Sequence, residues 1–285
     1  MTVSPLISAT ELADALAEGV PVRLLDARYR LGFDDGHENY LAGHLPGAVF
    51  VDLERELSRP GDPSEGRHPL PSDDDLAAAV RRWGISEGQQ VVVYDDSRSL
   101  PASRVWWALR RAGLSEVRVL DGGLSAWRSS GGAIEIGEVI PEPGDVRLRV
   151  PGTADVLDTA QVAEWTGVLL DARAAERFRG ESEPIDPVAG HIPGARNLPI
   201  AEVLTADGRF LPPTEIAAAF EAAGAGQNVP AVAYCGSGVT AAQLALAGTL
   251  VGREVILYPG SWSAWSNTPG LPIATGPAST DDGLG

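Results

Sequence analysis

Lysine is absent from this 285-residue sequence, since all 22 of its basic residues are arginines. The absence excludes a Schiff-base lysine, covalent attachment of pyridoxal phosphate and the lysine of a P-loop. Cysteine is scarce as well, because the chain contains only Cys235. One thiol excludes an internal disulfide, a Cys-x-x-Cys redox pair and a cluster of thiolate zinc ligands. Any chemistry at Cys235 therefore uses that thiol alone or together with a thiol from another molecule.

Positive charge is also in short supply, with 22 basic against 39 acidic residues and a net charge of -17. Such a surface repels phosphate backbones and anionic lipids, so we expect no nucleic-acid partner and no membrane partner. No apolar run reaches membrane-spanning length, and Glu11 and Asp14 stand where a signal peptide needs a basic start and an apolar run. We therefore expect a cytoplasmic globular protein.

The chain contains one series of motifs twice. Each half has, in the same order, an Asp-Ala-Arg motif, a His-x-Pro-Gly-Ala motif, an apolar run ending in Tyr and a Ser-Ala-Trp motif. These motifs occupy 24–28, 43–48, 92–94 and 125–127 in the first half, and 169–173, 190–195, 232–234 and 263–265 in the second. Four motifs in one order at nearly constant spacing indicate a duplicated domain.

Short apolar runs alternate with helical patterns in both halves. The expected strands are 22–25, 91–94, 117–120, 168–170, 231–234 and 254–258. The expected helices are 73–83, 102–112, 214–223 and 240–251, the first of them capped by Ser72. This alternation predicts an α/β fold of two tandem domains, each a parallel sheet with helices on both faces.

A segment rich in proline, glycine and charge separates the two halves and is typical of a linker. We expect an N-terminal domain over 1–136, a linker over 137–153, a C-terminal domain over 154–278 and a tail over 279–285.

Cys235 lies where an apolar run gives way to a glycine-containing loop and then to a helical pattern. In a parallel α/β fold, ligands bind at loops that follow the carboxyl ends of strands. Gly236 and Gly238 allow successive backbone N–H groups to face one point, and the next helix adds positive potential at its N-terminus. Both effects stabilise a thiolate, a persulfide anion or a small oxyanion. The alternative is a buried core cysteine, which the following Gly-Ser-Gly disfavours. The matching position in the first half is Asp95, so we expect that half to be non-catalytic.

On these motifs the sequence resembles the tandem-domain rhodanese family of sulfurtransferases, from about Ser4 to Gly276. The resemblance implies α/β domains with the cysteine in the C-terminal one only, and no cofactor. It also implies that a sulfane sulfur passes from a small-molecule donor to a persulfide on Cys235 and then to an acceptor. The implied active-site loop consists of Cys235, Gly236, Ser237, Gly238, Val239 and Thr240.

The residues after the cysteine distinguish between donors. Family members that act on thiosulfate resemble Cys-Arg-Lys-Gly-Val-Thr, whereas those that act on 3-mercaptopyruvate resemble Cys-Gly-Ser-Gly-Val-Thr, the sequence at 235–240. A thiosulfate dianion favours cations beside its sulfur, whereas an α-keto acid needs hydrogen bonds near its thiol and carbonyl and one cation for its carboxylate. We therefore expect 3-mercaptopyruvate as the donor, with thiosulfate as the alternative. Ser237 supplies the hydroxyl in this interpretation, and loop capping is its alternative role.

Two arginines are candidates for binding the donor carboxylate. Arg177 matches a substrate-binding arginine of the family, and its planar guanidinium suits a carboxylate. Arg173 is the second candidate, although an arginine of the Asp-Ala-Arg motif more often braces a loop through carboxylates. The family pattern also has a further arginine in the segment 181–188, and this sequence has none there.

Some members of the family are thought to combine an Asp and a His of the N-terminal domain with the loop serine. The matching candidates are His44 and either Asp34 or Asp35. Histidine transfers protons near neutral pH. However, His44 and His191 both begin the repeated His-x-Pro-Gly-Ala motif, which also fits a structural role.

A persulfide on a lone cysteine needs an external acceptor, such as a thioredoxin-like protein, a small dithiol or cyanide. His37 and His68 are interpreted as scattered loop histidines, and without a ligand cluster no metal site is expected. A Cys-x5-Arg phosphatase would need arginine at Ala241, and arsenate reductases need more thiols. A non-enzymatic sulfur carrier is the last alternative, which the intact loop disfavours.

Overall fold

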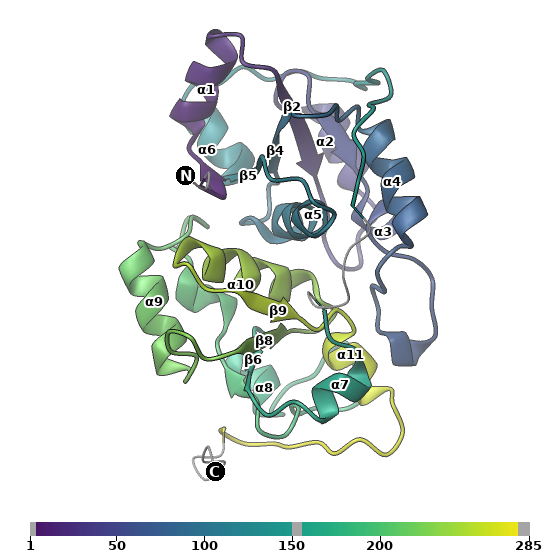
Figure 1. Ribbon diagram of the computed structural model, residues 1–285, viewed down its shortest axis with the longest axis vertical. Coiled ribbons are helices and arrows are strands. Elements are labelled where there is room, and N and C mark those ends of the chain that lie inside the picture. Colours follow the sequence, from purple (N-terminus) through teal and green to yellow (C-terminus); the bar gives the residue numbers. More distant parts are fainter. Residues whose placement is uncertain (1–3, 150–155, 279–285) are drawn as a thin grey trace. The chain divides into compact units, whose positions relative to one another are not determined.

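The computed structural model describes residues 4–149 and 156–278 (Figure 1). The chain divides into two compact units. The first unit consists of 1–59, 70–152 and 206–210, and the second of 60–69, 153–205 and 211–285. A short piece of each half of the sequence therefore belongs to the other half's unit. No helix in the described parts of the chain is long and apolar enough to cross a membrane.

The first unit is built on a five-stranded parallel sheet with the order β1-β5-β4-β2-β3. Leu24 and Val92 pack with Leu12 and Trp127 in a cluster on one face, which α1 and α6 cover. Helix α5 packs against β2, β4 and β5 (Figure 1). The strands are β1 (Leu6–Ile7), β2 (Val22–Ala27), β3 (Val49–Val51), β4 (Gln90–Tyr94) and β5 (Val117–Leu120). The helices are α1 (Ala9–Ala17), α2 (Gly36–Ala42), α3 (Leu53–Glu56), α4 (Asp73–Arg82), α5 (Leu100–Arg111) and α6 (Gly123–Ser129).

The second unit has a four-stranded parallel sheet with the order β7-β6-β8-β9. Phe178 of α8 and Trp265 of α11 pack with Val232 of β8 in one buried cluster, whereas α10 packs against β8 and β9. The strands are β6 (Val168–Asp171), β7 (Arg196–Asn197), β8 (Ala231–Tyr234) and β9 (Val255–Leu257). The helices are α7 (Thr159–Ala163), α8 (Ala175–Phe178), α9 (Pro213–Ala222), α10 (Val239–Leu250) and α11 (Ser261–Ser266), with 3₁₀ turns η1 (Pro63–Glu65) and η3 (Ile200–Val203).

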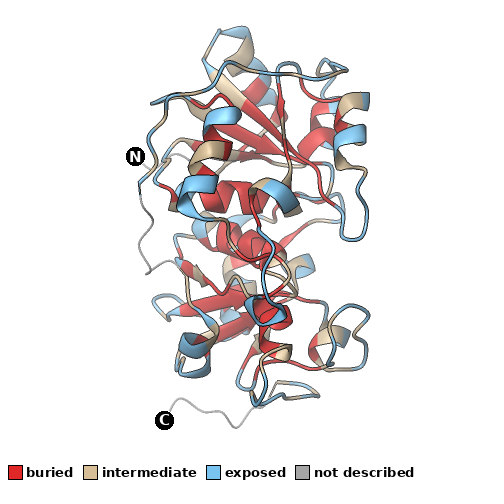
Figure 2. Ribbon diagram, turned by 90° about the vertical axis from the view of Figure 1, so that its right-hand side faces the viewer, coloured by how far each residue is buried: buried red, intermediate tan, exposed pale blue. Residues whose placement is uncertain are grey.

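The predicted fold class is confirmed by two parallel sheets, each packed with helices (Figure 2). All six expected strands and all four expected helices form, with ends that shift by no more than two residues. Ser72 caps α4 as expected, because its hydroxyl accepts the backbone N–H of Asp75. The short strands at the sheet edges, β1, β3 and β7, were not predicted, since two or three residues are too few to show a periodicity.

The segment expected to be a linker begins as part of the first unit. Backbone N–H groups of Gly144 and Arg149 donate to the carbonyls of Arg81 and Ala112, at 2.8 and 2.9 Å. Pro141 also lies against Gly84. Residues 150–153, the end of the expected linker, lie outside the described residues.

The repeated motifs form a buried polar network in each unit. In the second unit, Arg173 pairs with Asp171 at 2.6 Å and donates to the carbonyl of Gly190 at 2.7 Å. The hydroxyl of Tyr234 accepts the backbone N–H of Ile192, and burial together with the charge of Asp171 raises the pKa of Tyr234. The network joins the end of β6 to the His-x-Pro-Gly-Ala turn and to the end of β8. The first unit repeats it with Asp26, Arg28, Gly43, Tyr94 and Leu45.

Candidate active site

Cys235 follows directly after β8, at the carboxyl end of a central strand of the second sheet. Its side chain is buried, with 2% of the residue exposed. The backbone N–H of Gly238 donates to Sγ of Cys235 at 3.2 Å, and α10 begins at the next residue, Val239. A hydrogen-bonded sulfur at a helix N-terminus is in a place that stabilises negative charge on it.

The loop around Cys235 is held by the start of α11. Backbone N–H groups of Trp262 and Ser263 donate to the carbonyls of Cys235 and Gly236, both at 2.9 Å. Ser261 has a left-handed φ of 54°, which is costly for a residue with a Cβ. In that conformation its hydroxyl accepts the backbone N–H of Cys235 at 3.1 Å and donates to a carbonyl at 2.9 Å. The bonds to Ser261 thus fix the position of the sulfur-bearing residue.

Gly238 is required by both space and backbone conformation. Its φ is +80°, and a Cβ there would lie 2.6 Å from the carbonyl oxygen of Pro259. The remaining loop residues enter α10, whose first residue Val239 is buried and whose second, Thr240, is half-buried. The structure therefore brings the six predicted loop residues, 235–240, together as one compact turn.

Ser237 contacts a histidine that the sequence interpretation left without a role. Nδ1 of His68 lies 2.8 Å from Oγ of Ser237, and His68 is buried. The segment 60–69 belongs to the second unit and packs on α11, where a Cβ at Gly66 would lie 2.6 Å from the carbonyl oxygen of Gly260. The neighbouring Arg67 is fixed by its backbone N–H, which donates to Ser263. A serine hydroxyl paired with a buried histidine can pass a proton to a reacting group.

Arg177 in α8, a candidate for binding the donor, lies beside this loop, and its guanidinium is paired within the protein. Nη2 of Arg177 lies 2.6 Å from Glu183 and 3.3 Å from Asp186. Asp186 also accepts two hydrogen bonds from Arg67, at 2.9 and 3.2 Å. A second arginine is therefore present, although it comes from the segment 60–69 and not from 181–188.

The pKa values of the two carboxylates between these arginines shift in opposite directions. Burial raises the pKa of Glu183, but hydrogen bonds from Arg177 and from backbone N–H groups outweigh it and the net pKa is lowered. Burial raises the pKa of Asp186, and the attraction of Arg67 and Arg177 offsets this only in part because the charge of Glu183 raises it further. The side chains of both are at most 4% exposed. Glu183 is therefore the more firmly ionised of the pair.

Arg173, the second predicted ligand, is fully engaged within the protein. Its side chain is 2% exposed, and its donors reach Asp171, Glu183 and the carbonyl of Gly190. The guanidinium also lies over the ring of Trp262, with its central carbon 4.7 Å from the ring centroid. These contacts fit the bracing role that the Asp-Ala-Arg motif suggested.

The first unit holds a carboxylate at the position that matches Cys235. Asp95 is buried and accepts the backbone N–H groups of Ser97, Ser99 and Ala102 at 2.8 to 3.0 Å. Burial raises the pKa of Asp95 to about 7, and these three hydrogen bonds oppose the shift. The backbone N–H groups at this strand-to-helix junction are thus already bonded to a carboxyl group of the chain itself.

The candidates from the N-terminal half lie in the first unit and are not joined to one another. His44 is buried, stacks on Tyr40, and has both ring nitrogens within hydrogen-bond distance of backbone carbonyls, at 2.8 and 3.0 Å. These contacts match the structural role considered for the His-x-Pro-Gly-Ala motif. Asp34 is exposed, and Asp35 pairs with Arg30.

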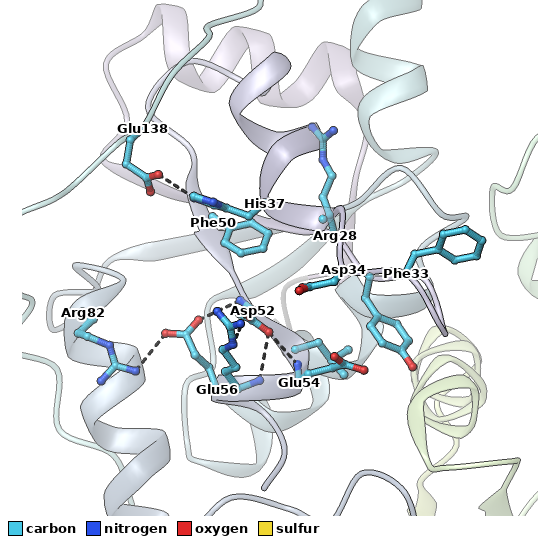
Figure 3. A pocket seen from close by; sticks show the side chains of 14 residues that line it. Arg28, Phe33, Asp34, His37, Phe50, Asp52, Glu54, Glu56, Arg82 and Glu138 are labelled. Carbon is cyan, nitrogen blue, oxygen red and sulfur yellow. Dashed lines mark hydrogen bonds and ion pairs between the residues drawn. The ribbon is translucent and has the colours of Figure 1, made fainter. Parts of the chain in front are cut away.

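Asp34 lines a cavity of about 450 Å³ in the first unit (Figure 3). Figure 3 shows Arg28 at this cavity, and it shows the hydrogen bond between His37 and Glu138. None of the residues that line it belongs to the Cys235 loop. Within residues 4–149 and 156–278, no group of three or more His, Cys, Asp or Glu side chains is arranged to hold a metal ion.

The sequence and structure match known proteins closely. The family model for the rhodanese-like domain matches residues 8–130 and again 153–268. A Mycobacterium tuberculosis protein provisionally named thiosulfate sulfurtransferase SseB is 50% identical over 96% of this chain and 98% of its own. A Pseudomonas aeruginosa protein provisionally named 3-mercaptopyruvate sulfurtransferase is 45% identical over 97% of this chain and 100% of its own. The crystal structure of SseA from Escherichia coli, described as having the rhodanese fold, matches with a TM-score of 0.79 and 34% identity, covering 91% of this chain and 99% of that one.

Proposed function

Because the chain belongs to the rhodanese family, we propose that it is a sulfurtransferase that takes sulfur from 3-mercaptopyruvate. The sulfur passes to a persulfide on Cys235 and then to a thiol acceptor, and pyruvate is released. The predicted class of enzyme is confirmed, since the relatives from both organisms are named sulfurtransferases. Their names differ in the donor, so the choice of donor depends on the site itself.

The transfer from 3-mercaptopyruvate balances without a further reactant. The Cys235 thiolate attacks the donor sulfur, a sulfur–sulfur bond forms, and the carbon–sulfur bond breaks. The electron pair of the broken bond goes to the enolate of pyruvate. The proton of the donor thiol moves to the carbon of that enolate, which leaves pyruvate and a persulfide anion on Cys235.

The hydrogen bond between Ser237 and His68 is the observation that carries the choice of donor. Cleavage of a carbon–sulfur bond produces an enolate that must gain a proton, and a hydroxyl bonded to histidine can relay it. Cleavage of the sulfur–sulfur bond of thiosulfate releases sulfite, which needs no such proton. The pair of Ser237 and His68 therefore has a chemical task only with the keto acid.

Thiosulfate remains the second candidate donor, and one observation favours it. Arg67 and Arg177 both lie beside Gly236, so the site has two guanidinium groups that could attract a dianion. Both are paired with the carboxylate of Asp186, however, and the loop itself carries no cation. This balance of charge suits a single carboxylate better than a dianion.

The acceptor is expected to be an external thiol. Cys235 is the only cysteine of the chain, so no internal thiol can receive the sulfur. A small dithiol, a thioredoxin-like protein or cyanide would attack the outer sulfur of the persulfide and restore the thiolate. The first half-reaction forms the Cys235 persulfide and the second consumes it, so we expect ping-pong kinetics.

Intact mass spectrometry of the reduced protein tests the proposal. After a brief exposure to 3-mercaptopyruvate we expect a gain of one sulfur atom and release of one equivalent of pyruvate, with a smaller gain from thiosulfate. The Cys235→Ser variant should gain nothing from either donor. A gain mainly from thiosulfate would establish the second candidate, and no gain from either would refute sulfur transfer at Cys235.

A further inference from the structure

The charged side chains beside Cys235 form one continuous chain of alternating sign. Successive members of opposite charge lie 2.6 to 3.3 Å apart, so that Arg173 and Arg177 each bridge two carboxylates and Arg67 ends the series. From the buried end outward the members are Asp171, Arg173, Glu183, Arg177, Asp186 and Arg67.

The exposure of the three arginines rises along this charge chain, whereas its carboxylates all stay buried. The side chain of Asp171 is fully buried and that of Arg173 is 2% exposed, whereas Arg177 is 18% and Arg67 is 24% exposed. The chain as a whole carries three positive and three negative charges. Its solvent-accessible end is therefore a cation, and that cation is Arg67.

Arg67 is also the arginine with the fewest carboxylates to neutralise it. Arg173 pairs with Asp171 and Glu183, and Arg177 pairs with Glu183 and Asp186. Among the described residues, Arg67 forms an ion pair with Asp186 alone. The charge chain is neutral overall, with Asp171 at its buried end and Arg67 as its positive, outer end.

The outer end of the charge chain lies against the reactive loop. A Cβ built on Gly236 would be 3.7 Å from Nη1 of Arg177 and 4.0 Å from Nη2 of Arg67. Apart from the adjoining residues of the chain, these two guanidinium groups supply the three atoms nearest to that point. Two guanidinium groups from separate segments therefore lie within van der Waals distance of the place that a side chain at position 236 would take, next to Cys235.

We propose that Arg67 is the principal residue that binds the anionic group of the sulfur donor, with Arg177 as its partner. The proposal rests on the proposed function, because it assigns the carboxylate of 3-mercaptopyruvate to this place. Arg67 then supplies the second cation that the segment 181–188 lacks. Asp186 is a positioning residue that holds the two guanidinium groups on either side of the donor's anionic group.

Steady-state kinetics of the Arg67→Gln variant with 3-mercaptopyruvate test this assignment. We expect KM to rise by about 10-fold or more, because a charge-assisted hydrogen bond to the donor is lost. The kcat should change by less than about threefold, since the reacting thiol and Ser237 remain. Pyruvate, which has the same keto carboxylate and no sulfur, should become a weaker inhibitor by a factor similar to the rise in KM.

Two further variants control the experiment. Arg179→Gln removes the same charge from a surface arginine that pairs only with Glu181, and its KM should stay within about twofold of the wild type. Arg67→Lys keeps the charge without the planar fork, so its KM should lie between those of the wild type and Arg67→Gln.

The possible outcomes test the role of Arg67 independently of the identity of the sulfur donor. An unchanged KM and an unchanged inhibition by pyruvate in a folded Arg67→Gln variant would overturn the role of Arg67. A lowered kcat with an altered pH profile and an unchanged KM would overturn it too, because it would mean that Arg67 acts by placing His68. If the wild type instead uses thiosulfate, the proposed function fails, and the same ratio of KM values measured with thiosulfate still decides the role of Arg67.

Discussion

Replacing His68 should slow sulfur transfer from 3-mercaptopyruvate far more than the loss of one hydrogen bond can explain. The two informative variants are His68→Ala, which removes every ring contact, and His68→Asn. The asparagine amide can occupy the place of Nδ1 and keep a hydrogen bond to Ser237, which lies 2.8 Å from that atom in the wild type. Asparagine cannot, however, take up and release a proton near neutral pH.

The two roles open to His68 differ in magnitude. A neutral hydrogen bond contributes about 0.5–1.5 kcal/mol, so a histidine that only orients Ser237 would change the rate by roughly 2- to 10-fold. General acid–base catalysis contributes about 10²- to 10⁴-fold. We therefore expect a loss of at least about 100-fold in both variants with 3-mercaptopyruvate. With thiosulfate the loss should stay below about 10-fold, because sulfite leaves without needing a proton.

Single-turnover formation of the Cys235 persulfide, followed by mass spectrometry and by release of pyruvate, measures this rate directly. Far-ultraviolet circular dichroism and the urea midpoint confirm that each variant is folded, which matters because His68 is buried. The reasoning fails if His68→Asn keeps at least a third of the wild-type rate. It also fails if both variants lose equal factors with the two donors.

Four other substitutions test buried contacts in the two units. Gly238→Ala should lower the free energy of unfolding by at least about 1–2 kcal/mol, because φ is +80° and the new Cβ would collide with the backbone of Pro259. It should also slow persulfide formation at least about 10-fold. Urea unfolding measures the first effect and mass spectrometry the second. Tyr234→Phe should cost about 1–3 kcal/mol in urea unfolding, because it leaves a buried backbone N–H without its acceptor, and Tyr94→Phe should cost a similar amount. Asp95 has a pKa raised by burial to about 7, so the folded state binds a proton between about pH 4 and 7 that the unfolded state releases, and stability falls as pH rises through that range. The stability deficit of Asp95→Asn relative to the wild type should therefore shrink by about 2 kcal/mol between pH 5.5 and 8.5, and a deficit independent of pH would contradict this assignment.

The fold could be predicted in detail because its signals are local and occur twice. Buried central strands such as β4 and β8 are short apolar runs that end at a tyrosine and a loop. The repeated Asp-Ala-Arg and His-x-Pro-Gly-Ala motifs are one buried network, in which an arginine ties its own aspartate to a carbonyl of the following turn. The same network forms in each unit, and it needs the same residue types at the same spacing. Both halves of the sequence therefore show the same motifs.

The site could be predicted where it is contiguous in sequence or, as for Arg177, where a residue matches a motif of the family. The residues 235–240 form a single turn, and their strand-to-helix context is visible in the sequence. Arg67 and His68 are separated from their partners Asp186 and Ser237 by 119 and 169 residues. They also lie in the first half of the chain, whereas the segment 60–69 belongs to the second unit. No local periodicity encodes that exchange, so His68 was interpreted as an ordinary loop histidine.

The candidates His44, Asp34 and Asp35 show the opposite case, in which the sequence suggests residues that the structure does not place beside the Cys235 loop. A histidine at the start of a repeated turn is compatible with proton transfer and with packing, and the sequence alone does not distinguish these two roles. In the structure, the ring of His44 is enclosed by Tyr40 and two backbone carbonyls. The histidine that does touch the loop serine carries no motif at all.

Comparison of the two units indicates how one scaffold yields a reactive site and an inert one. In the first unit the chain supplies its own carboxyl groups: Asp95 accepts the cluster of backbone N–H groups, and Asp96 lies 3.7 Å from Arg28. In the second unit the matching positions are Cys235, whose sulfur accepts a single backbone N–H, and Gly236, which has no side chain. The strand-to-helix junction of the second unit lacks these two carboxyl groups. Its positive potential and its arginines are therefore available to the Cys235 thiolate and to an anionic ligand. The sulfur of Cys235 occupies the first of these places, and the missing side chain at Gly236 leaves the second to the anionic group of a donor, which our proposal assigns to the carboxylate of the keto acid.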